Sequence, residues 1–456
     1  MGIKYQKRRI KKSYYKRLTA AICAVLAVVL AVVLAVWGVD KLFNLTPKGE
    51  DTTSIVSDVS SEPKVPYKVS SATVVNTGDL LIHSPVLNGA KQADGSYDFS
   101  DVFTPVSSYF KDADLAIANL EVTLGGTESG KYSGYPTFNT PDSLIDGVKS
   151  AGIDMLLTAN NHSYDTRLFG LKRTVSVLKQ KGVDYLGTRE AAEDPHFIIK
   201  SVNGINIGMA CFTYENATST PGRKSINGNL MAEEANPLLS SFSYGKIDEF
   251  YAEATAMING MKEQNADCVV FYMHWGEEYQ TKPNNWQKTI AQKLCDLGVD
   301  IIVGGHPHVV QPIELLTSAD GTHNTVCVYS LGNALSNQRK EVMTSCKTGH
   351  TEDGMLFYYT FDKYSDGKVI LSSVDIVPTW VNKFPSGGVN KYKIYPLEND
   401  ADAVAALGLN TATANNAKAS YKRTAALIGE GLTRCQNFLD CEVRFVSAEP
   451  TESVTP

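Results

Sequence analysis

Between Ser70 and Pro378 the sequence alternates short apolar runs with segments of helical periodicity. The runs with the length and β-branched content of strands are ATVVNTG, DLAIANLE, DMLLTANN, INIGMACFTY, DCVVFYMHW, DIIVGGH and TVCVYSLGN. Helical patterns such as GLKRTVSVLKQKG and NNWQKTIAQKLCDLG fall between them. This alternation is typical of an α/β domain in which helices cover the sheet strands. It predicts one such domain over residues 69–380.

The end of this domain and the residues after it have their own pattern. Two apolar runs, FYYTFD and KVILSSVDIVP, flank a Tyr-Ser-Asp-Gly turn and predict a closing hairpin. Residues 381–456 form a C-terminal extension, with helical periodicity from Asn416 to Leu439. A disulfide between Cys435 and Cys441 is an option that the sequence leaves open.

An apolar run without charged residues, Leu18–Val39, precedes the domain. A helix of this length spans roughly 33 Å, enough for a hydrocarbon core of about 30 Å. Residues 1–17 are rich in Lys and Arg and contain no acidic residue, which favours their retention in the cytoplasm. We therefore predict an uncleaved, single-pass transmembrane signal-anchor, with the main domain outside the cell and residues 40–68 as a disordered linker. A cleaved signal peptide is the alternative.

Composition excludes several classes of protein. Hydrophobic residues make up 43% and charged residues 20% of the chain, so it is neither disordered nor collagen-like. The chain has 43 Lys and Arg residues against 49 Asp and Glu residues, and its cations are concentrated at the N-terminus. The rest of the chain is acidic and implies no basic face, so we expect no nucleic-acid partner.

Polar residues of metal-binding type stand where the predicted strands end, the place where ligands gather in open α/β sheets. They are Asp79, Glu121, Asn160, Asn161, His162, His274, Glu278, His306, His308 and Asn333. Each motif alone has an ordinary explanation, such as a turn, a helix cap or a core imidazole. Their coincidence after separate strands favours a metal centre. Imidazole together with carboxylate suits Mn, Fe or Zn, and the number of ligands predicts two divalent ions that share a carboxylate.

These motifs also resemble those of a known family. GDLLIH, ANLE, TANNHSYD, YMHWGEEY, GGHPHVVQPIE and YSLGN are similar to the ordered motifs of the CapA-type capsule-biosynthesis proteins. That bacterial family is a branch of the calcineurin-like metallophosphoesterase superfamily. The resemblance covers residues 72–336 and implies a sandwich of two mixed β-sheets flanked by helices, an N-terminal membrane anchor, and a role in making or exporting poly-γ-glutamate.

The resemblance implies a role for individual residues. Asp79 and His308 would bind the first ion, and Glu121 would bridge both ions. The residues expected to bind the second ion are Asn161, His274 and His306. His162 would assist leaving-group protonation or charge stabilisation, and Asp165, three residues on, would orient it in place of the family's adjacent carboxylate.

The sequence departs from the superfamily pattern at three positions, the first of which is Glu121, where the wider superfamily usually has Asp. Leu81 stands where the superfamily has a His, which makes His83 a further candidate ligand. Ser163 stands where a carboxylate normally follows the catalytic His. Glu278 and Asn333 are the remaining candidates, Glu278 as a support for the metal-bound imidazoles.

The motifs and the family resemblance suggest three alternative functions. The first is a membrane-anchored, extracellular di-metal phosphoesterase that supports capsular poly-γ-glutamate synthesis or export. The second is a surface metallophosphoesterase that acts on another phosphate ester. The third is a non-catalytic capsule-assembly subunit. The expected partners are the membrane, membrane-embedded capsule-synthesis subunits, and an anionic polymer or phosphate-ester substrate.

Overall fold

The structure is a computed structural model that describes residues 65–398 and 407–447. The predicted cytoplasmic segment (1–17), signal-anchor (18–39) and most of the linker (40–68) lie outside the described residues. Among the described helices, none combines the length and the apolar composition that a membrane crossing requires. Residues from Val65 onward form one compact unit.

The first of two large sheets has eight strands in the order β17-β16-β15-β1-β2-β3-β4, with β14 also paired to β1. Its strands are β1 (Lys68–Leu80), β2 (Leu115–Leu120), β3 (Met155–Leu157), β4 (Asp184–Leu186), β14 (Asn333–Leu335), β15 (Asp353–Tyr364), β16 (Val369–Ser386) and β17 (Val389–Pro396). Strands β1 to β4 are parallel, whereas β15, β16 and β17 are antiparallel to their neighbours. The sheet is therefore mixed.

The second sheet has seven strands in the order β12-β13-β11-β10-β6-β5, with β9 also paired to β6. Its strands are β5 (Ile198–Val202), β6 (Ile205–Tyr214), β9 (Ser241–Phe242), β10 (Cys268–His274), β11 (Ile301–Gly305), β12 (Ile313–Thr317) and β13 (Asn324–Val328). The inner strands are parallel, and β5 and β12 are antiparallel edge strands. A separate small hairpin joins β7 (Ser225–Ile226) and β8 (Asn229–Leu230).

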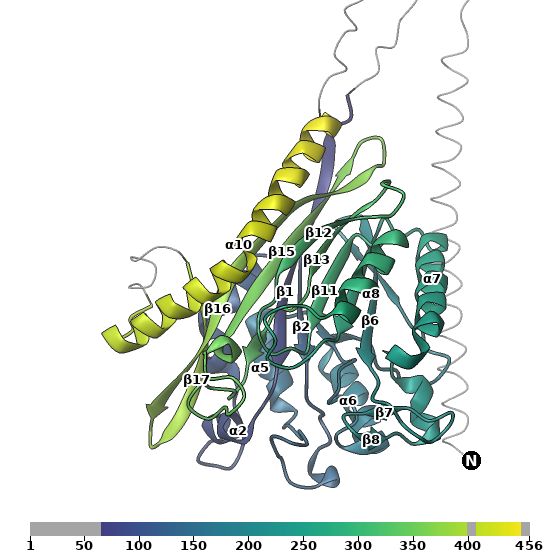
Figure 1. The fold of residues 1–456 in the computed structure, drawn as a ribbon. Coiled ribbons are helices and arrows are strands. Elements are labelled where there is room, and N and C mark those ends of the chain that lie inside the picture. The colour runs from purple at the N-terminus through teal and green to yellow at the C-terminus, as the bar shows by residue number, and fades with distance from the viewer. Residues whose placement is uncertain (1–64, 399–406, 448–456) are drawn as a thin grey trace, which may run out of the picture. The chain divides into compact units, whose positions relative to one another are not determined.

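Helices cover the outer faces of both sheets (Figure 1). They are α2 (Ser84–Ala90), α3 (Ser100–Phe103), α4 (Ser107–Lys111), α5 (Ser143–Ala151), α6 (Arg167–Lys181), α7 (Ile247–Glu263) and α8 (Asn285–Asp296). Helix α10 (Thr411–Ser447) instead packs on strands of both sheets, and its Ile428, Cys435 and Leu439 join the core between the sheets. Short 3₁₀ turns occur at Thr104–Val106, Thr127–Ser129, Glu233–Leu238, Tyr244–Lys246 and His350–Glu352. Helix α8 begins with a capping box in which the side chains of Asn284 and Gln287 bind each other's backbone N–H. The mixed α/β architecture with two sheets agrees with the predicted fold class.

The alternation of side chains along a strand explains the layers. On β1, Val74 packs into the core between the sheets, whereas the next residue, Val75, packs against α5 and α6. On β10, Val270 faces the inner core, and Phe271 faces α7 and α8. Because both faces of these strands are buried, the sequence reads as continuous apolar runs.

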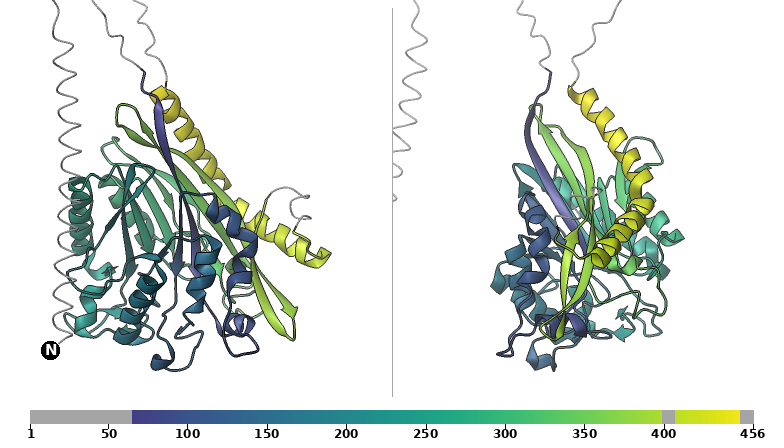
Figure 2. Two further views of the ribbon diagram at one scale, coloured as in Figure 1. Left: turned by 180° about the vertical axis from the view of Figure 1, so that it is seen from behind. Right: turned by 90° about the vertical axis from the view of Figure 1, so that its left-hand side faces the viewer.

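The C-terminal part completes the same sandwich. Strands β15 and β16 form the predicted hairpin, and β16 continues past residue 380, so that position lies inside a strand. Helix α10 is longer than the segment predicted from Asn416 to Leu439 because it packs along β16 and β12 (Figures 1 and 2). Gly431 permits this approach, since a Cβ there would lie 1.8 Å from the carbonyl oxygen of Ile313. Cys435 is buried, Cys441 is exposed, and both are free thiols.

The two ends of the sandwich differ in what they carry. The start of β1 and the end of α10 lie together at one end (Figures 1 and 2). The parallel strands of both sheets run toward the opposite end. Their carboxyl ends therefore share one edge, where the predicted metal ligands are found.

Candidate metal centre

The six predicted metal ligands come from both sheets. Asp79 lies in β1, Glu121 directly follows β2, and Asn161 lies in the turn after β3. His274 ends β10, and the last two ligands, His306 and His308, follow β11. All six side chains are buried. The fold therefore gathers in one place residues that are up to 229 positions apart in the sequence.

A bulge in β1 presents Asp79 to the site. The pairing of β1 with β2 shifts register between Thr77 and Asp79, at Gly78. A Cβ on Gly78 would lie 1.9 Å from the carbonyl oxygen of Gly332, so only glycine fits there. The Asp79 N–H donates to that same carbonyl group over 3.0 Å, which fixes the backbone at the ligand.

The loop after β11 holds its two imidazoles with a strained backbone. His306 and His308 have φ angles of 97° and 57°, a region that non-glycine residues rarely adopt. The His306 N–H donates to Asp79 Oδ2 over 3.3 Å, and the Tyr279 N–H donates to the Pro307 carbonyl over 2.8 Å. Strain of this kind persists where the surroundings enforce it and concentrates at functional sites.

The distances place Glu121 between two pairs of ligands. In one pair, His308 Nδ1 lies 3.1 Å from Asp79 Oδ2. In the other, His274 Nε2 lies 2.8 Å from Asn161 Oδ1. Glu121 Oε1 is 3.5 Å from His274 Nε2 and 3.7 Å from His308 Nε2. Its carboxylate can therefore reach cations on both sides.

Two sets of three residues have ligand atoms within 4.8 Å of one another, and both contain Glu121. One set adds His306 and His308, and the other adds Asp79 and His274. In this grouping Asp79 lies with His274, and His308 lies with His306. The family pattern instead assigns Asp79 and His308 to the same ion. A shared Glu121 is common to both.

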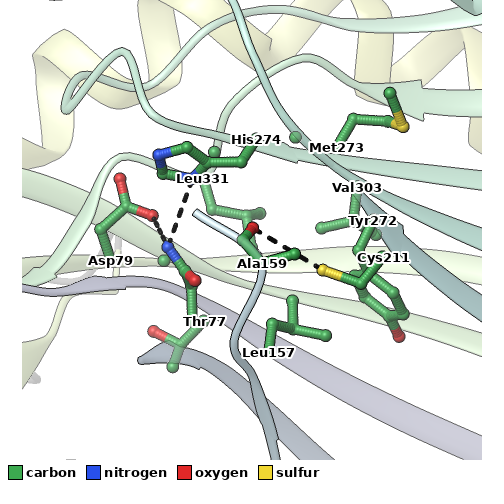
Figure 3. A pocket seen from close by; sticks show the side chains of 14 residues that line it. Thr77, Asp79, Leu157, Ala159, Cys211, Tyr272, Met273, His274, Val303 and Leu331 are labelled. Atoms are coloured by element: carbon green, nitrogen blue, oxygen red, sulfur yellow. Dashed lines mark hydrogen bonds between the residues drawn. The ribbon is translucent and has the colours of Figure 1, made fainter. Parts of the chain in front are cut away.

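The chemistry of the donors fits divalent cations. Glu121 Oε1 and His306 Nδ1 are buried and have no hydrogen-bond partner in the described part of the chain. Buried polar atoms are normally paired, and a bound cation would satisfy both. Imidazole, carboxylate and amide oxygen are donors that suit Mn, Fe or Zn. Behind Asp79 and His274 lies a cavity of about 20 Å³, lined largely by apolar side chains such as Leu157 and Val303 (Figure 3).

Burial and mutual charge shift the pKa values of these groups. Burial lowers the pKa of His274 to about 3 and lowers the pKa of His306 as well. Burial would also lower the pKa of His308, but Glu121 and Asp79 outweigh it and raise that pKa to about 9. Burial, and then the charge of Asp79, raise the pKa of Glu121 well above its usual value. Without cations, these shifts favour the protonated forms of His308 and Glu121.

The predicted catalytic pair lies beside these ligands. His162, next to Asn161, has its Nδ1 2.8 Å from Asp165 Oδ2. The same carboxylate oxygen accepts a hydrogen bond from the Phe138 N–H over 2.6 Å. The Phe138 ring meets the His162 ring edge-on at 4.7 Å between centroids. These contacts fix the orientation of the imidazole.

The three further candidates, His83, Glu278 and Asn333, belong to neither ligand set. His83 Nδ1 accepts a hydrogen bond from the Asn337 N–H over 3.2 Å, and the residue belongs to neither ligand set. Glu278 is exposed and also lies outside both sets. Asn333 is buried, and its Nδ2 donates to the His308 carbonyl over 3.3 Å, so it supports that ligand through the backbone.

Sequence reasoning missed other residues at the site. Asn119 contacts both carboxylates, and the Tyr214 ring lies 4.8 Å from the His306 ring. Asn227, at the tip of the β7–β8 hairpin, has its Nδ2 3.5 Å from His162 Nδ1. The sequence could have indicated Asn119, because residues two apart in a strand share a face and Asn119 stands two residues before Glu121. Nothing in the sequence indicated Asn227, because only tertiary packing brings the β7–β8 hairpin to the site.

Comparison with known proteins gives consistent matches. The family of bacterial capsule synthesis proteins named PGA_cap matches residues 73–338, which include all the predicted ligands. The capsule biosynthesis protein CapA of Bacillus anthracis is 30% identical over 272 residues, 58% of this chain and 60% of that protein. The PGA biosynthesis protein CapA of Bacillus subtilis (strain 168) is 28% identical over 278 residues, 60% of this chain and 65% of that protein. The chain thus matches less than two thirds of the length of either relative.

Proposed function

Because the chain belongs to the PGA_cap family of bacterial capsule synthesis proteins, within the metallophosphoesterase-like superfamily, we propose that it is a metal-dependent phosphoesterase acting in capsule synthesis. The relative named for PGA biosynthesis supports poly-γ-glutamate as the polymer. One observation carries the phosphoesterase proposal. Glu121 is common to both ligand sets, and its Oε1 lies between His274 and His308 without a hydrogen-bond partner among the described residues.

The chain's own residues account for most of the proposed chemistry. The six predicted ligands would hold two divalent cations, which would polarise a phosphate ester and lower the pKa of an attacking water. In its doubly protonated form, His162 donates its Nδ1–H to Asp165 and passes its Nε2 proton to the leaving oxygen, which leaves the neutral imidazole with its proton on Nδ1. The edge-on Phe138 ring shields this imidazole on one side.

The anchor and the domain plan are part of the same proposal. Residues 18–39 cross a bacterial cell membrane, residues 1–17 remain in the cytoplasm, and residues 40–68 connect to an extracellular domain that begins at residue 69 and includes β17 and α10 of the extension 381–456. The uncharged run and its basic flank support this topology. Membrane-embedded capsule-synthesis subunits are the proposed partners. Protease treatment of intact cells should remove the domain and leave residues 1–17 protected.

The test of activity uses the purified full chain loaded with Mn²⁺ and an aryl phosphate as substrate. His306→Ala should abolish turnover together with ion binding. His162→Ala should keep both ions but lower kcat by about 100-fold, since general acid catalysis contributes on that scale. His196→Ala is the matched control, because its imidazole pairs with Glu253 at a half-exposed position and contacts no predicted ligand. Stoichiometric ion binding without turnover on any phosphate ester would contradict the proposal.

The non-catalytic assembly role has one observation in its favour. Leu81 replaces the superfamily's histidine, and His83 belongs to neither ligand set, so fewer donors would be available to an ion beside Asp79. In that role the ions would only stabilise a partner-binding surface. A deletion strain that regains polymer with His162→Ala, but not with His306→Ala, would favour assembly. A deletion that leaves polyglutamate unchanged and alters wall phosphate would favour a different phosphate ester.

A further inference from the structure

Two buried asparagine side chains lie next to the predicted metal ligands. Asn119 lies in β2 and Asn160 lies in the turn after β3, and neither side chain is assigned to an ion. Asn119 Nδ2 donates to Asp79 Oδ1 over 2.8 Å and to Glu121 Oε2 over 3.2 Å. A single amide group therefore holds the two carboxylates of the centre.

Asn160 connects this amide to the catalytic turn. Its Nδ2 donates to Asn119 Oδ1 over 3.1 Å and to the Leu120 carbonyl over 2.8 Å. Its Oδ1 accepts a hydrogen bond from the His162 N–H over 3.1 Å. Asn160 thus links β2 to the turn that also carries Asn161.

The direction of each hydrogen bond in this chain is fixed by the carboxylates. Asn119 must present its NH₂ group to Asp79 and Glu121, because its carbonyl oxygen would repel them. Its Oδ1 then faces Asn160 and requires a donor there. The hydrogen bonds run from the His162 N–H through both amides to the carboxylates, an arrangement in which each bond polarises the next.

We infer that Asn119 and Asn160 are positioning residues that act as one unit and couple the ion-holding carboxylates to the turn bearing Asn161 and His162. This inference rests on the proposed metal centre. Asn119 sets the separation of the two carboxylates. Asn160 sets the distance between that pair and the Asn161 amide, which lies 2.8 Å from His274.

The experiment is a double-mutant cycle in the full chain with Asn119→Ala, Asn160→Ala and both together. Each single change should weaken Mn²⁺ binding by about 10- to 100-fold in calorimetry, the range for groups that orient metal ligands. The double variant should lose no more than the stronger single variant, because removing either amide already breaks the unit. Asn160→Ala should also alter the absorption spectrum of the Co²⁺-substituted chain and lower kcat more than it changes KM.

Asn76→Ala is the matched control. Asn76 is as buried as the two amides and lies in β1, but its Nδ2 donates to the Phe357 carbonyl, away from the ligands. It should leave ion affinity and the Co²⁺ spectrum unchanged. Equal losses from Asn76→Ala, or losses from the two amide variants that multiply in the double variant, would overturn the inference.

The inference and the proposed function fail in different ways. A wild-type chain that binds ions but hydrolyses nothing contradicts the proposed activity, and the binding cycle still tests the amides. A wild-type chain that binds no ion contradicts both the metal centre and the positioning role. In each case the urea midpoints of the ion-free variants separate misfolding from a change at the site.

Discussion

Two clusters of buried carboxylates occur in the described domain, and their charges are balanced in opposite ways. Asp353 accepts two hydrogen bonds from Arg423, at 2.7 and 2.6 Å, and one from Ser420 at 2.6 Å. Its neighbour Glu352 pairs with Arg339 at 2.9 Å. Here the chain supplies its own cations, and Arg423 ties α10 to the first sheet.

The cluster of Asp79 and Glu121 lacks such a partner. No Lys or Arg contacts either carboxylate in the described residues, and the nearest positive group is the imidazole of His308. Glu121 Oε1 lacks any hydrogen bond within the same residues. The comparison teaches that arginines of the chain balance the charges of Asp353 and Glu352, so that cluster is complete. The cluster of Asp79 and Glu121 is incomplete, because its charges require protons or external cations.

Breaking the complete cluster should have the largest effect. Arg423→Met leaves Asp353 buried without its cation, which should cost about 3–5 kcal/mol of unfolding free energy. Urea unfolding of the ion-free and ion-loaded chains should show the same loss, because the cluster does not depend on ions. Lys422→Met, at an exposed position on the same helix, should have little effect. A loss of less than about 1 kcal/mol would mean that Arg423 does not balance Asp353.

Removing a predicted ligand from the cluster around Asp79 and Glu121 should instead weaken ion binding. His274→Ala should weaken Mn²⁺ binding by roughly 100-fold or more, equivalent to about 2.7 kcal/mol. Isothermal titration calorimetry measures this directly. His323→Ala, whose imidazole contacts the Val299 carbonyl far from the centre, is the control. Unchanged affinity in His274→Ala would remove this residue from the ligands.

The pH dependence of the ion-free chain should sharpen the contrast. The pKa of His308 is about 9 in the folded chain against 6.5 for a free imidazole, so its protonation stabilises the fold fully below pH 6.5. That stabilisation should be lost as the pH rises through 9, by about 1 kcal/mol per pH unit. Urea unfolding at pH 6, 7.5 and 9 tests the slope, and His308→Gln should flatten it. Ion affinity should rise over the same range, because ligation displaces the proton.

The smallest expected effect has an unusual sign. Glu121→Gln replaces a carboxyl group whose pKa burial and Asp79 raise, so the neutral amide should stabilise the ion-free chain at pH 8 by about 1 kcal/mol. The same change should weaken binding of both ions. Thermal unfolding with and without Mn²⁺ measures the two effects. Destabilisation of the ion-free chain would show that burial and Asp79 do not destabilise the ionised Glu121 carboxylate.

The sequence by itself determined most of the central strands and the edge of the sheets where the candidate metal ligands gather, but it did not predict β4, β5, β12 or β17. Apolar runs followed by Asp79, Glu121 and His274 indicated where the candidate ligands would gather, because the carboxyl ends of parallel strands meet at one edge whatever the details of packing. The departure from the family motif at Ser163 suggested Asp165 as the partner of His162, which agrees with the 2.8 Å contact between them.

Only the tertiary structure decided how the charges are compensated. Asp353 and Arg423 are 70 residues apart, and neither lies in a recognisable motif. The orientation of His83 toward Asn337, the approach of Asn227 to His162 and the full extent of α10 likewise depend on contacts between distant segments. Local periodicity records which face of an element is buried, but the partner that meets that face is chosen when the sheets and helices pack.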